Sequence, residues 1–328
     1  MSQDIVQNLQ NKLIINKANE MGIECKPLIP GCEDFLELSY KDKNIMINKT
    51  RSHKFSFIAG FLAKNKDASN LLLKRFGLPV PDQIVVSKMS EEAINFLNTY
   101  KLVAVKPIDT NCSVGITLGI ESEDELENAI KTASSYSNKV IIQKYIEGYD
   151  YRVLVIDGKV EGVLEYQPAF IEGDGYSSIE QLIYKLNEDP LRRNNAGEFK
   201  PLKKISIKSK NLHFNLKKQG KTLQDILDKG ERIQLLLSGN VLAGGISIDR
   251  TEDICSVNAN IAIEAARAIN VDVAGIDIRC KDIRVPINNT TEGILEVNGL
   301  PDMTDHVLPY QGTPRDVVKA YLQYLFKE

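Results

Sequence analysis

The fold is decided by two stretches, Val273-Ala-Gly-Ile-Asp-Ile-Arg-Cys280 and Gly293-Ile-Leu-Glu-Val-Asn298. Both are short apolar runs, which predict buried strands near 273–279 and 293–298. Glu296 and Asn298 share one face because side chains alternate along a strand. Two carboxylates on neighbouring core strands repel each other unless a cation lies between them. The pattern therefore indicates Mg²⁺ held by Asp277, Glu296 and Asn298, unless both strands lie at an exposed edge with ordinary surface acids.

The residues that flank these strands predict helices. Asn258 is expected to cap a helix in which Ile261, Ala262, Ala265, Ala268 and Ile269 recur at helical spacing. Thr313-Pro314 is expected to begin a C-terminal helix, with Pro in the first helical position.

Strand and helix patterns alternate in the first half of the chain. Helices are predicted at 66–76, 90–101 and 122–136, and strands at 83–87, 102–106, 115–120 and 139–146. The alternation indicates mixed α/β architecture. Residues 165–235 are rich in Lys, Asn, Gly and Asp, and we predict long loops and short elements of functional importance there.

The bulk composition is that of a globular protein. The chain has 328 residues, of which 43% are hydrophobic and 26% charged, and its net charge of −3 does not favour nucleic acid. Five scattered cysteines without Cys-x-x-Cys spacing fit a reduced, cytoplasmic location. Residues 1–15 lack a signal-peptide core, and no apolar run approaches the roughly 18 residues of a membrane span. We therefore expect neither a membrane nor a nucleic-acid partner.

Lys106 follows the apolar run Val-Ala-Val and precedes Pro107, so it ends a strand. Its ammonium could point at a phosphate or simply reach solvent. The loop that follows, Ile108-Asp-Thr-Asn-Cys-Ser-Val-Gly115, is small and polar, so its backbone N–H groups could bind phosphate oxygens. A plain connection between two strands is the alternative for this loop.

A second turn, Gln143-Lys-Tyr-Ile-Glu-Gly-Tyr-Asp-Tyr-Arg152, interrupts an apolar strand. Backbone groups near Tyr145 and Ile146 could contact an adenine edge, and Asp150 could bind ribose hydroxyls. Arg152 could hold phosphate oxygens in its rigid fork. A β-turn with solvated charges is the alternative.

Taken in chain order, these pieces resemble an ATP-grasp enzyme, and above all the glutathione-synthetase-like ATP-grasp half of cyanophycin synthetases. The matching stretches are Lys66-Asp67, Gly77-Leu-Pro-Val-Pro81, Val105-Lys106-Pro107, Tyr145-Ile-Glu-Gly-Tyr-Asp-Tyr-Arg152, Gly173-Asp-Gly175, Lys200-Pro-Leu-Lys-Lys-Ile205, Gln219-Gly220, Gly244-Gly245-Ile-Ser-Ile-Asp249, Val273-Ala-Gly-Ile-Asp-Ile278 and Glu296-Val-Asn298. The Mur-ligase-like half of those synthetases has no counterpart in this sequence.

The resemblance implies an α/β (α+β) ATP-grasp fold, in which two α/β lobes grip ATP. The expected divisions are a pre-ATP-grasp segment at 1–64, an N-terminal lobe with the phosphate loop at 65–146, and a C-terminal lobe with the metal site and substrate loops at 147–328. The implied cofactors are ATP and Mg²⁺, with Mn²⁺ as a possible substitute. The implied ATP-binding residues are Lys66, Lys106, Asn111, Ser113, Gly115, Gln143, Tyr145, Ile146 and Asp150. Arg152 and Lys106 take catalytic roles, and Asp277, Glu296 and Asn298 bind the metal.

The chain also departs from that family. Its phosphate loop is poorer in Gly, and Tyr166 stands where the family often has Arg. The stretch 299–306, Gly-Leu-Pro-Asp-Met-Thr-Asp-His, partly resembles D-alanine–D-alanine ligases, in which it borders the acceptor pocket. Tyr166, Asp305 and His306 are therefore candidate substrate contacts.

The function expected from the resemblance is a carboxylate–amine ligase that forms an amide through an acyl-phosphate. The substrate would be an amino acid or short peptide, and a homodimer is left open. Two alternatives stand: an ATP-binding regulatory module with reduced catalysis, favoured by the thinned phosphate loop and Tyr166, and a kinase or carboxylase that uses the same nucleotide grip.

Overall fold

The computed structural model describes residues 8–110, 114–192, 202–237, 239 and 241–327. Contacts divide the chain into two compact units. The first comprises residues 1–80, 151–165 and 248–328, and the second comprises 81–150 and 166–247. The domain bounds expected from the sequence, at residues 64 and 146, stay predictions.

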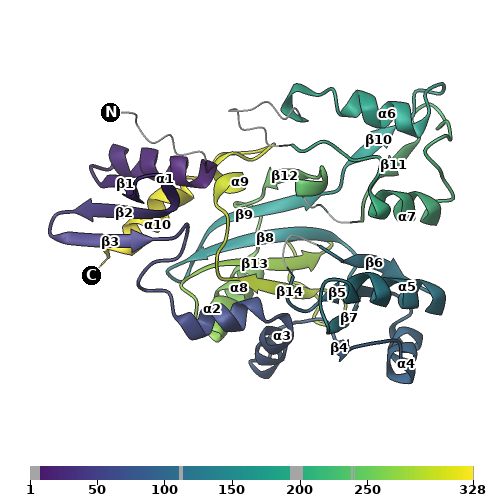
Figure 1. Ribbon diagram of the computed structural model, residues 1–328, viewed down its shortest axis with the longest axis horizontal. Helices are drawn as coiled ribbons and strands as arrows, with labels where there is room; N and C mark the ends of the chain where they lie inside the picture. Colours follow the sequence, from purple (N-terminus) through teal and green to yellow (C-terminus); the bar gives the residue numbers. More distant parts are fainter. Residues whose placement is uncertain (1–7, 111–113, 193–201, 238, 240, 328) are drawn as a thin grey trace. The chain divides into compact units, whose positions relative to one another are not determined.

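The first unit contains two sheets and the helices that cover them (Figure 1). Its N-terminal part consists of α1 (Leu9–Glu20), β1 (Glu24–Ile29), β2 (Cys32–Tyr40), β3 (Lys43–Ile47), α2 (Phe57–Lys64) and α3 (Lys66–Arg75). The remainder is built around β8 (Tyr149–Ile156), β9 (Lys159–Gln167), β12 (Ile246–Asp249), α8 (Ser256–Ile269), β13 (Val273–Cys280), β14 (Gly293–Asn298), α9 (Thr304–Val307) and α10 (Val317–Phe326). The larger sheet has the order β12-β9-β8-β13-β14, and the smaller has the order β1-β2-β3.

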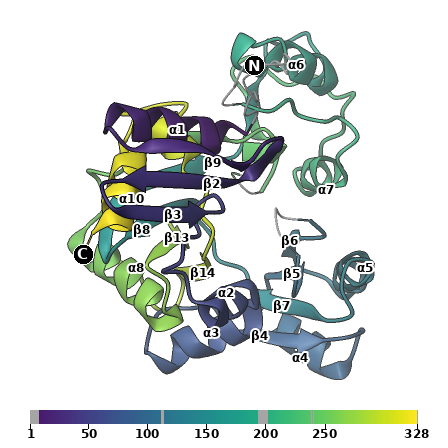
Figure 2. The same cartoon turned by 60° about the vertical axis from the view of Figure 1, so that its left-hand side comes forward.

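Alternate residues of β8 enter two different cores. Val153 and Val155 pack with α8 on one face of the larger sheet, in a core that also contains Ala262 and Ala265. Leu154 belongs to a second core, which α1, the smaller sheet and α10 share (Figure 2). β8 is therefore buried on both faces, which explains why residues 153–156 read as a continuous apolar run in the sequence.

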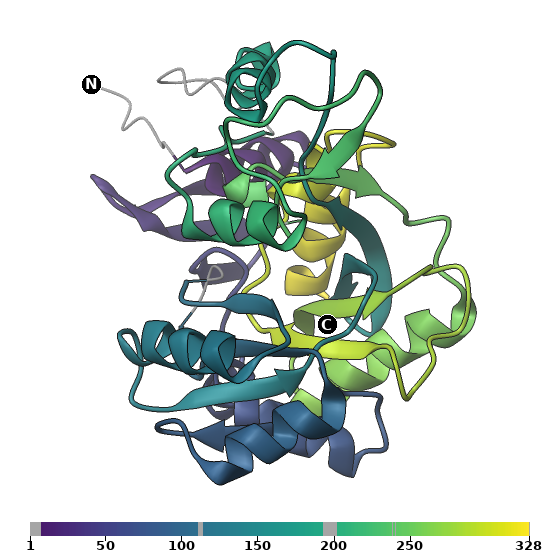
Figure 3. The ribbon, with the colours of Figure 1, turned by 90° about the vertical axis from the view of Figure 1, so that its right-hand side faces the viewer.

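The second unit also contains two sheets. Its elements are β4 (Gln83–Val86), α4 (Glu91–Tyr100), β5 (Val103–Pro107), β6 (Thr117–Ile120), α5 (Glu123–Ser134), β7 (Val140–Lys144), β10 (Phe170–Glu172), α6 (Ile179–Leu186), η1 (Pro190–Arg192), α7 (Lys210–Lys218), β11 (Arg232–Gln234) and η2 (Val241–Ala243). The four-stranded sheet has the order β4-β7-β5-β6 with antiparallel pairs, and α4 and α5 share one core with it (Figure 3). The segment 166–247 has a separate core.

The expected α/β class is confirmed, and most predicted elements are present within one to three residues. Two helix starts were predicted wrongly. Asn258 does not cap α8, which begins at Ser256 after Cys255. The C-terminal helix begins at Val317, where Asp316 accepts a hydrogen bond from the Lys319 N–H, and not at Thr313-Pro314.

Asn258 is instead a buried structural residue. Its amide donates to the carbonyl oxygens of Ile283, at 2.9 Å, and Val285, at 2.8 Å, and accepts from the Ile287 N–H at 3.0 Å. The side chain is 0% exposed. It therefore fixes the loop that connects β13 to β14. In the described part of the chain, no helix is both long and apolar enough to cross a membrane.

We expect Asn258→Ala to lower the free energy of unfolding by about 3 kcal/mol, because it leaves buried backbone groups without partners. Asn260→Ala is the matched control, since this side chain is exposed on the same helix. Urea unfolding followed by circular dichroism measures both. Equal stability of the two variants would contradict the role assigned to Asn258.

Candidate active site

The predicted metal-binding residues lie together on β13 and β14. The antiparallel register places Asp277 opposite Glu296 and Gly275 opposite Asn298. The Asn298 amide nitrogen is 3.2 Å from Asp277 Oδ2 and 3.2 Å from Glu296 Oε1. The pairing of the strands thus brings two carboxylates and one amide onto one face, and their metal role stays a prediction.

Arg152 reaches this group from β8, the other neighbour of β13. Its Nη2 is 3.0 Å from Asp277 Oδ2, and its Nε donates to Asp277 Oδ1. Gly275 makes room for the arginine, because a Cβ there would lie 2.8 Å from Arg152 Cδ and 3.2 Å from Pro301 Cβ. The sequence analysis missed this requirement for glycine, and only the strand order reveals it.

The Asp277 carboxyl is partly buried and lies beside a second carboxyl, that of Glu296. Burial raises the pKa of its carboxyl to about 7; the Arg152 guanidinium opposes the rise, and the Glu296 carboxylate adds to it. A divalent cation would relieve this repulsion. Asp277, Glu296 and Asn298 all carry side-chain oxygen atoms, which Mg²⁺ and Mn²⁺ prefer as ligands. The Asn298 amide would have to turn its oxygen toward the metal. No group of three His, Cys, Asp or Glu side chains that could hold a metal occurs in the described ranges, and the site at Asp277 has two acids and one amide.

The second unit holds the predicted nucleotide residues that surround Lys106. This side chain is only 8% exposed, and its Nζ donates to Gln143 Oε1 at 3.1 Å. The Gln143 amide in turn donates to Gln83 Oε1 at 2.9 Å. The register places Gln143 opposite both Gln83 and Ala104, so β7 connects the three polar side chains across the sheet. Gln83 was not singled out from the sequence, because only strand pairing shows its contact.

The remaining nucleotide candidates are more scattered. The Tyr145 N–H donates to the Leu102 carbonyl at 3.0 Å, and Ile146 is buried. Asp150 accepts from the Gly239 N–H at 3.3 Å. Lys66 begins α3 in the first unit, whereas Lys106 lies on β5 in the second, and the role of Lys66 stays a prediction.

The predicted phosphate loop is described only at its ends. Asn111 and Ser113 lie outside the described residues. Gly115 has a φ of +73°, and a Cβ there would lie 2.7 Å from Tyr136 Cδ2 and 2.8 Å from Pro107 Cγ. Both the conformation and the close packing demand glycine at this position.

The three substrate candidates fall in different surroundings. Tyr166 lies in the second unit, where its backbone approaches Gly239 closely. Asp305 and His306 lie on α9 of the first unit. His306 is 1% exposed and packs on Gly162, and neither ring nitrogen has a hydrogen-bond partner in the described part of the chain. Burial and, to a smaller extent, Arg152 lower the pKa of this imidazole to about 3, against an opposing effect of Asp249.

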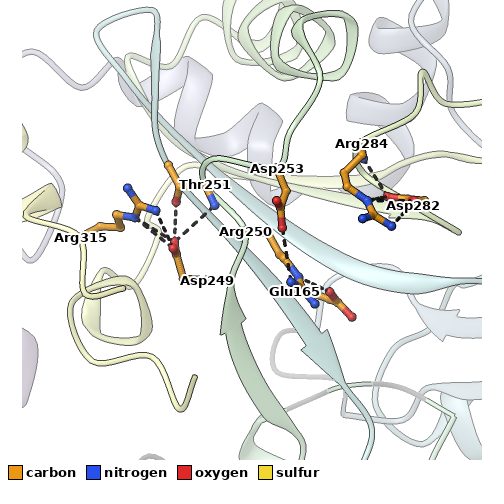
Figure 4. A network of polar contacts seen from close by, with 8 residues as sticks. All are labelled: Glu165, Asp249, Arg250, Thr251, Asp253, Asp282, Arg284 and Arg315. Atoms are coloured by element: carbon orange, nitrogen blue, oxygen red, sulfur yellow. Dashed lines mark hydrogen bonds and ion pairs between the residues drawn. The ribbon is translucent and has the colours of Figure 1, made fainter. Parts of the chain in front are cut away.

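A polar network fixes the chain that follows α9 (Figure 4). Arg315 pairs with Asp249 at 2.7 Å, which joins the start of the C-terminal helix segment to β12. Burial raises the pKa of the Asp249 carboxyl, but hydrogen bonds from Arg315 and Thr251 outweigh it and leave the pKa below its usual value. Arg250 pairs with the buried Glu165 at 2.7 Å and connects β12 to β9.

This fold is that of the ATP-grasp ligases. The comparisons give the particular relatives. A family model described as D-ala D-ala ligase C-terminus matches residues 72–179. The chain is 38% identical over 297 residues to a cyanophycin synthetase of Geminocystis herdmanii, a match that covers 89% of this chain and 34% of the relative.

Two further likenesses involve glutathione enzymes. The chain is 30% identical over 322 residues to a glutathione biosynthesis bifunctional protein of Clostridium perfringens, which covers 97% of this chain and 41% of that protein. The crystal structure of a bifunctional glutathione synthetase from Pasteurella multocida matches with a TM-score of 0.68 at 27% identity, over 97% of this chain and 43% of that one. The resemblance expected from the sequence is confirmed, and the chain spans less than half the length of each of these relatives.

The buried His306 predicts a pH-dependent stability. The unfolded chain binds a proton at this imidazole below about pH 6.5, whereas the folded chain does so only near pH 3. Stability is therefore complete at neutral pH and is lost as the pH falls through this window. Between pH 7.5 and 5.5 the wild type should lose about 1.4 kcal/mol more than His306→Asn.

Denaturant unfolding at the two pH values measures this difference. The exposed His53, changed to Asn, is the control and should leave the pH dependence of the wild type unaltered. Parallel curves for wild type and His306→Asn would show that the imidazole is not held neutral by burial.

Proposed function

We propose that the chain is an ADP-forming carboxylate–amine ligase that makes an amide or peptide bond through an acyl-phosphate. The observation that carries the proposal is the placement of Asp277 opposite Glu296, with Asn298 against both carboxylates. Such an acid pair is costly unless it binds a cation. A magnesium–nucleotide is the cation-bearing substrate that this fold favours.

The implied metal fits the residues present. Asp277, Glu296 and the oxygen of Asn298 would hold Mg²⁺, or Mn²⁺ in its place, and the pKa of Asp277 is raised mainly by burial, with a smaller contribution from Glu296. The bound metal would supply positive charge to the β- and γ-phosphates of ATP. Arg152, now paired with Asp277, would share its guanidinium between that carboxylate and a reacting phosphate or substrate carboxylate.

The second unit would provide nucleotide binding. Lys106, oriented by Gln143, would offset charge on the phosphates, and Gly115 would allow a close approach of the loop backbone. Asp150 would bind ribose hydroxyls. We assign the adenine to Gln143 and the backbone near Tyr145 and Ile146, and further phosphate contacts to Lys66, Asn111 and Ser113, by resemblance.

The reaction requires that the protein position the substrates and exclude water, more than that it form covalent bonds with them. A substrate carboxylate oxygen attacks the γ-phosphorus, and ADP leaves. The amine then attacks the acyl carbon, loses a proton, and expels inorganic phosphate. Arg152 and Lys106 hold the phosphate charge while this happens.

The substrates that we propose are an amino acid or short peptide, in keeping with the cyanophycin and glutathione enzymes that the chain resembles. Tyr166, Asp305 and His306 stay predicted substrate contacts. The expected cytoplasmic location and the homodimer stay predictions as well.

An array of amino acids and dipeptides, assayed for ADP release with Mg-ATP, tests the function. The expected result is ADP release that needs one carboxylate and one amine, with an amide of matching mass. ADP release without an amide product would favour the kinase or carboxylase alternative, and no release with any pair would favour the regulatory module.

Glu296→Ala should lower Mg-dependent ADP release by at least about 100-fold, because it removes one of the two carboxylates that would face the metal. Glu264→Ala is the matched control, since Glu264 is an exposed acid on α8 of the same unit. Initial rates over a range of Mg²⁺ concentrations measure both. Full turnover by the Glu296 variant would refute the assignment of the metal site.

A further inference from the structure

A segment of the second unit crosses back to the nucleotide-binding sheet. We call residues Lys210–Leu237 the strap; it comprises α7, the turn after it and β11. The strap belongs to a hydrophobic core around Leu212 and Leu235, whereas the sheet β4–β7 has its own core with α4 and α5. The buried residues of the strap and those of the sheet therefore form two distinct cores.

An ion pair joins these two parts. The Lys218 Nζ, near the end of α7, is 2.8 Å from Glu121 Oε2 and 3.0 Å from Glu125 Oε2. Both carboxylates lie where β6 ends and α5 begins, and α7 lies next to this corner in Figures 1 and 2. Leu237, at the C-terminal end of the strap, is 3.0 Å from where a Cβ of Gly119 on β6 would be. The strap thus meets β6 at Leu237 and the residues just after β6 at Lys218.

Local hydrogen bonds hold Glu121 and Glu125, which we call the acidic corner, in place. Glu125 Oε2 accepts from the Glu121 N–H at 2.9 Å, and the Ser122 hydroxyl accepts from the Glu125 N–H. The Lys218 side chain is 22% exposed, against 62% for Glu121 and 29% for Glu125. Burial lowers the pKa of Lys218, but the two carboxylates outweigh it, so the lysine remains charged.

The acidic corner directly follows β6, and β6 pairs with the strand that carries Lys106. β6 pairs with β5, where Val105 lies opposite Thr117, and Lys106 follows on β5. Whatever is fixed to β6 is therefore fixed to the hairpin that carries the proposed phosphate-binding lysine. Partly exposed ion pairs contribute little to stability and weaken with salt, which suits a contact that opens and closes.

We propose that Lys218, with Glu121 and Glu125, is an ionic latch that holds the strap closed on the β5–β6 hairpin during turnover. The inference rests on the proposed ligase function, because closure would limit the loss of an acyl-phosphate to water. Lys218 is a positioning residue in this scheme and contacts neither substrate nor nucleotide.

A matched control exists within the strap. Lys221 pairs with Glu231 at 2.7 Å, with side chains 27% and 32% exposed, so this ion pair resembles the latch but does not reach the β5–β6 hairpin. Lys218→Ala and Lys221→Ala therefore remove similar ion pairs, of which only the first ties the strap to the sheet.

The first measurement needs no activity. Chymotrypsin should cleave the strap of Lys218→Ala about two- to fivefold faster than that of wild type or Lys221→Ala, the shift in population that a partly exposed ion pair supports. Chymotrypsin is chosen because the substitution removes a tryptic site. Added salt should speed cleavage of the wild type and leave Lys218→Ala unchanged. Equal cleavage of the three proteins overturns the latch.

The second measurement uses the ligase reaction. The ratio of ADP released to amide formed should rise about two- to fivefold in Lys218→Ala and stay at the wild-type value in Lys221→Ala. The charge-exchanged variant with Lys218→Glu, Glu121→Lys and Glu125→Lys should restore both readouts. An unchanged ratio in an active Lys218→Ala enzyme overturns the catalytic role of the latch. Absence of ligase activity in the wild type itself counts against the proposed function, while the proteolysis result still decides whether the latch exists.

Discussion

The repulsion between Asp277 and Glu296 is the constraint on which the rest of the site depends. The two carboxylates face each other across a pair of antiparallel strands, and the strand pair cannot slip without separating them. A like-charged pair in a partly buried position must be compensated. Arg152 provides part of that compensation and Asn298 another part. The repulsion that Arg152 and Asn298 leave uncompensated is the reason to assign a divalent cation to this site.

The surrounding unit keeps this costly arrangement rigid. β8 is buried on both faces, whereas β13 and β14 direct most of their apolar residues into the core with α8. Asn258 binds the loop that leads into β14, and the pair Asp249–Arg315 fixes the chain beyond it. The α8 core therefore stabilises the strand pair, which leaves its polar face for chemistry rather than stability.

The lysine group shows a different solution to the same problem of a buried charge. Lys106 is nearly buried, and its ammonium donates to the first of two glutamine amides that are hydrogen-bonded in series. These amide dipoles help to orient the buried cation, which is consistent with the role proposed for it.

The sequence by itself determined the apolar strands, the helices of the first half and the shared face of Glu296 and Asn298, because periodicity is a local property. It also carried the family resemblance, since the order of short motifs survives in the chain. Local patterns misplaced two helix starts: Asn258 has the residue type of a cap but binds the loop between β13 and β14, and the helix expected at Thr313 is capped by Asp316 instead. Only the tertiary structure decided that Asp277 faces Glu296, that Gly275 must lack a side chain beside Arg152, and that Gln83 supports Gln143. These facts depend on strand order and register, which pair residues far apart in the chain and leave no local trace in the sequence.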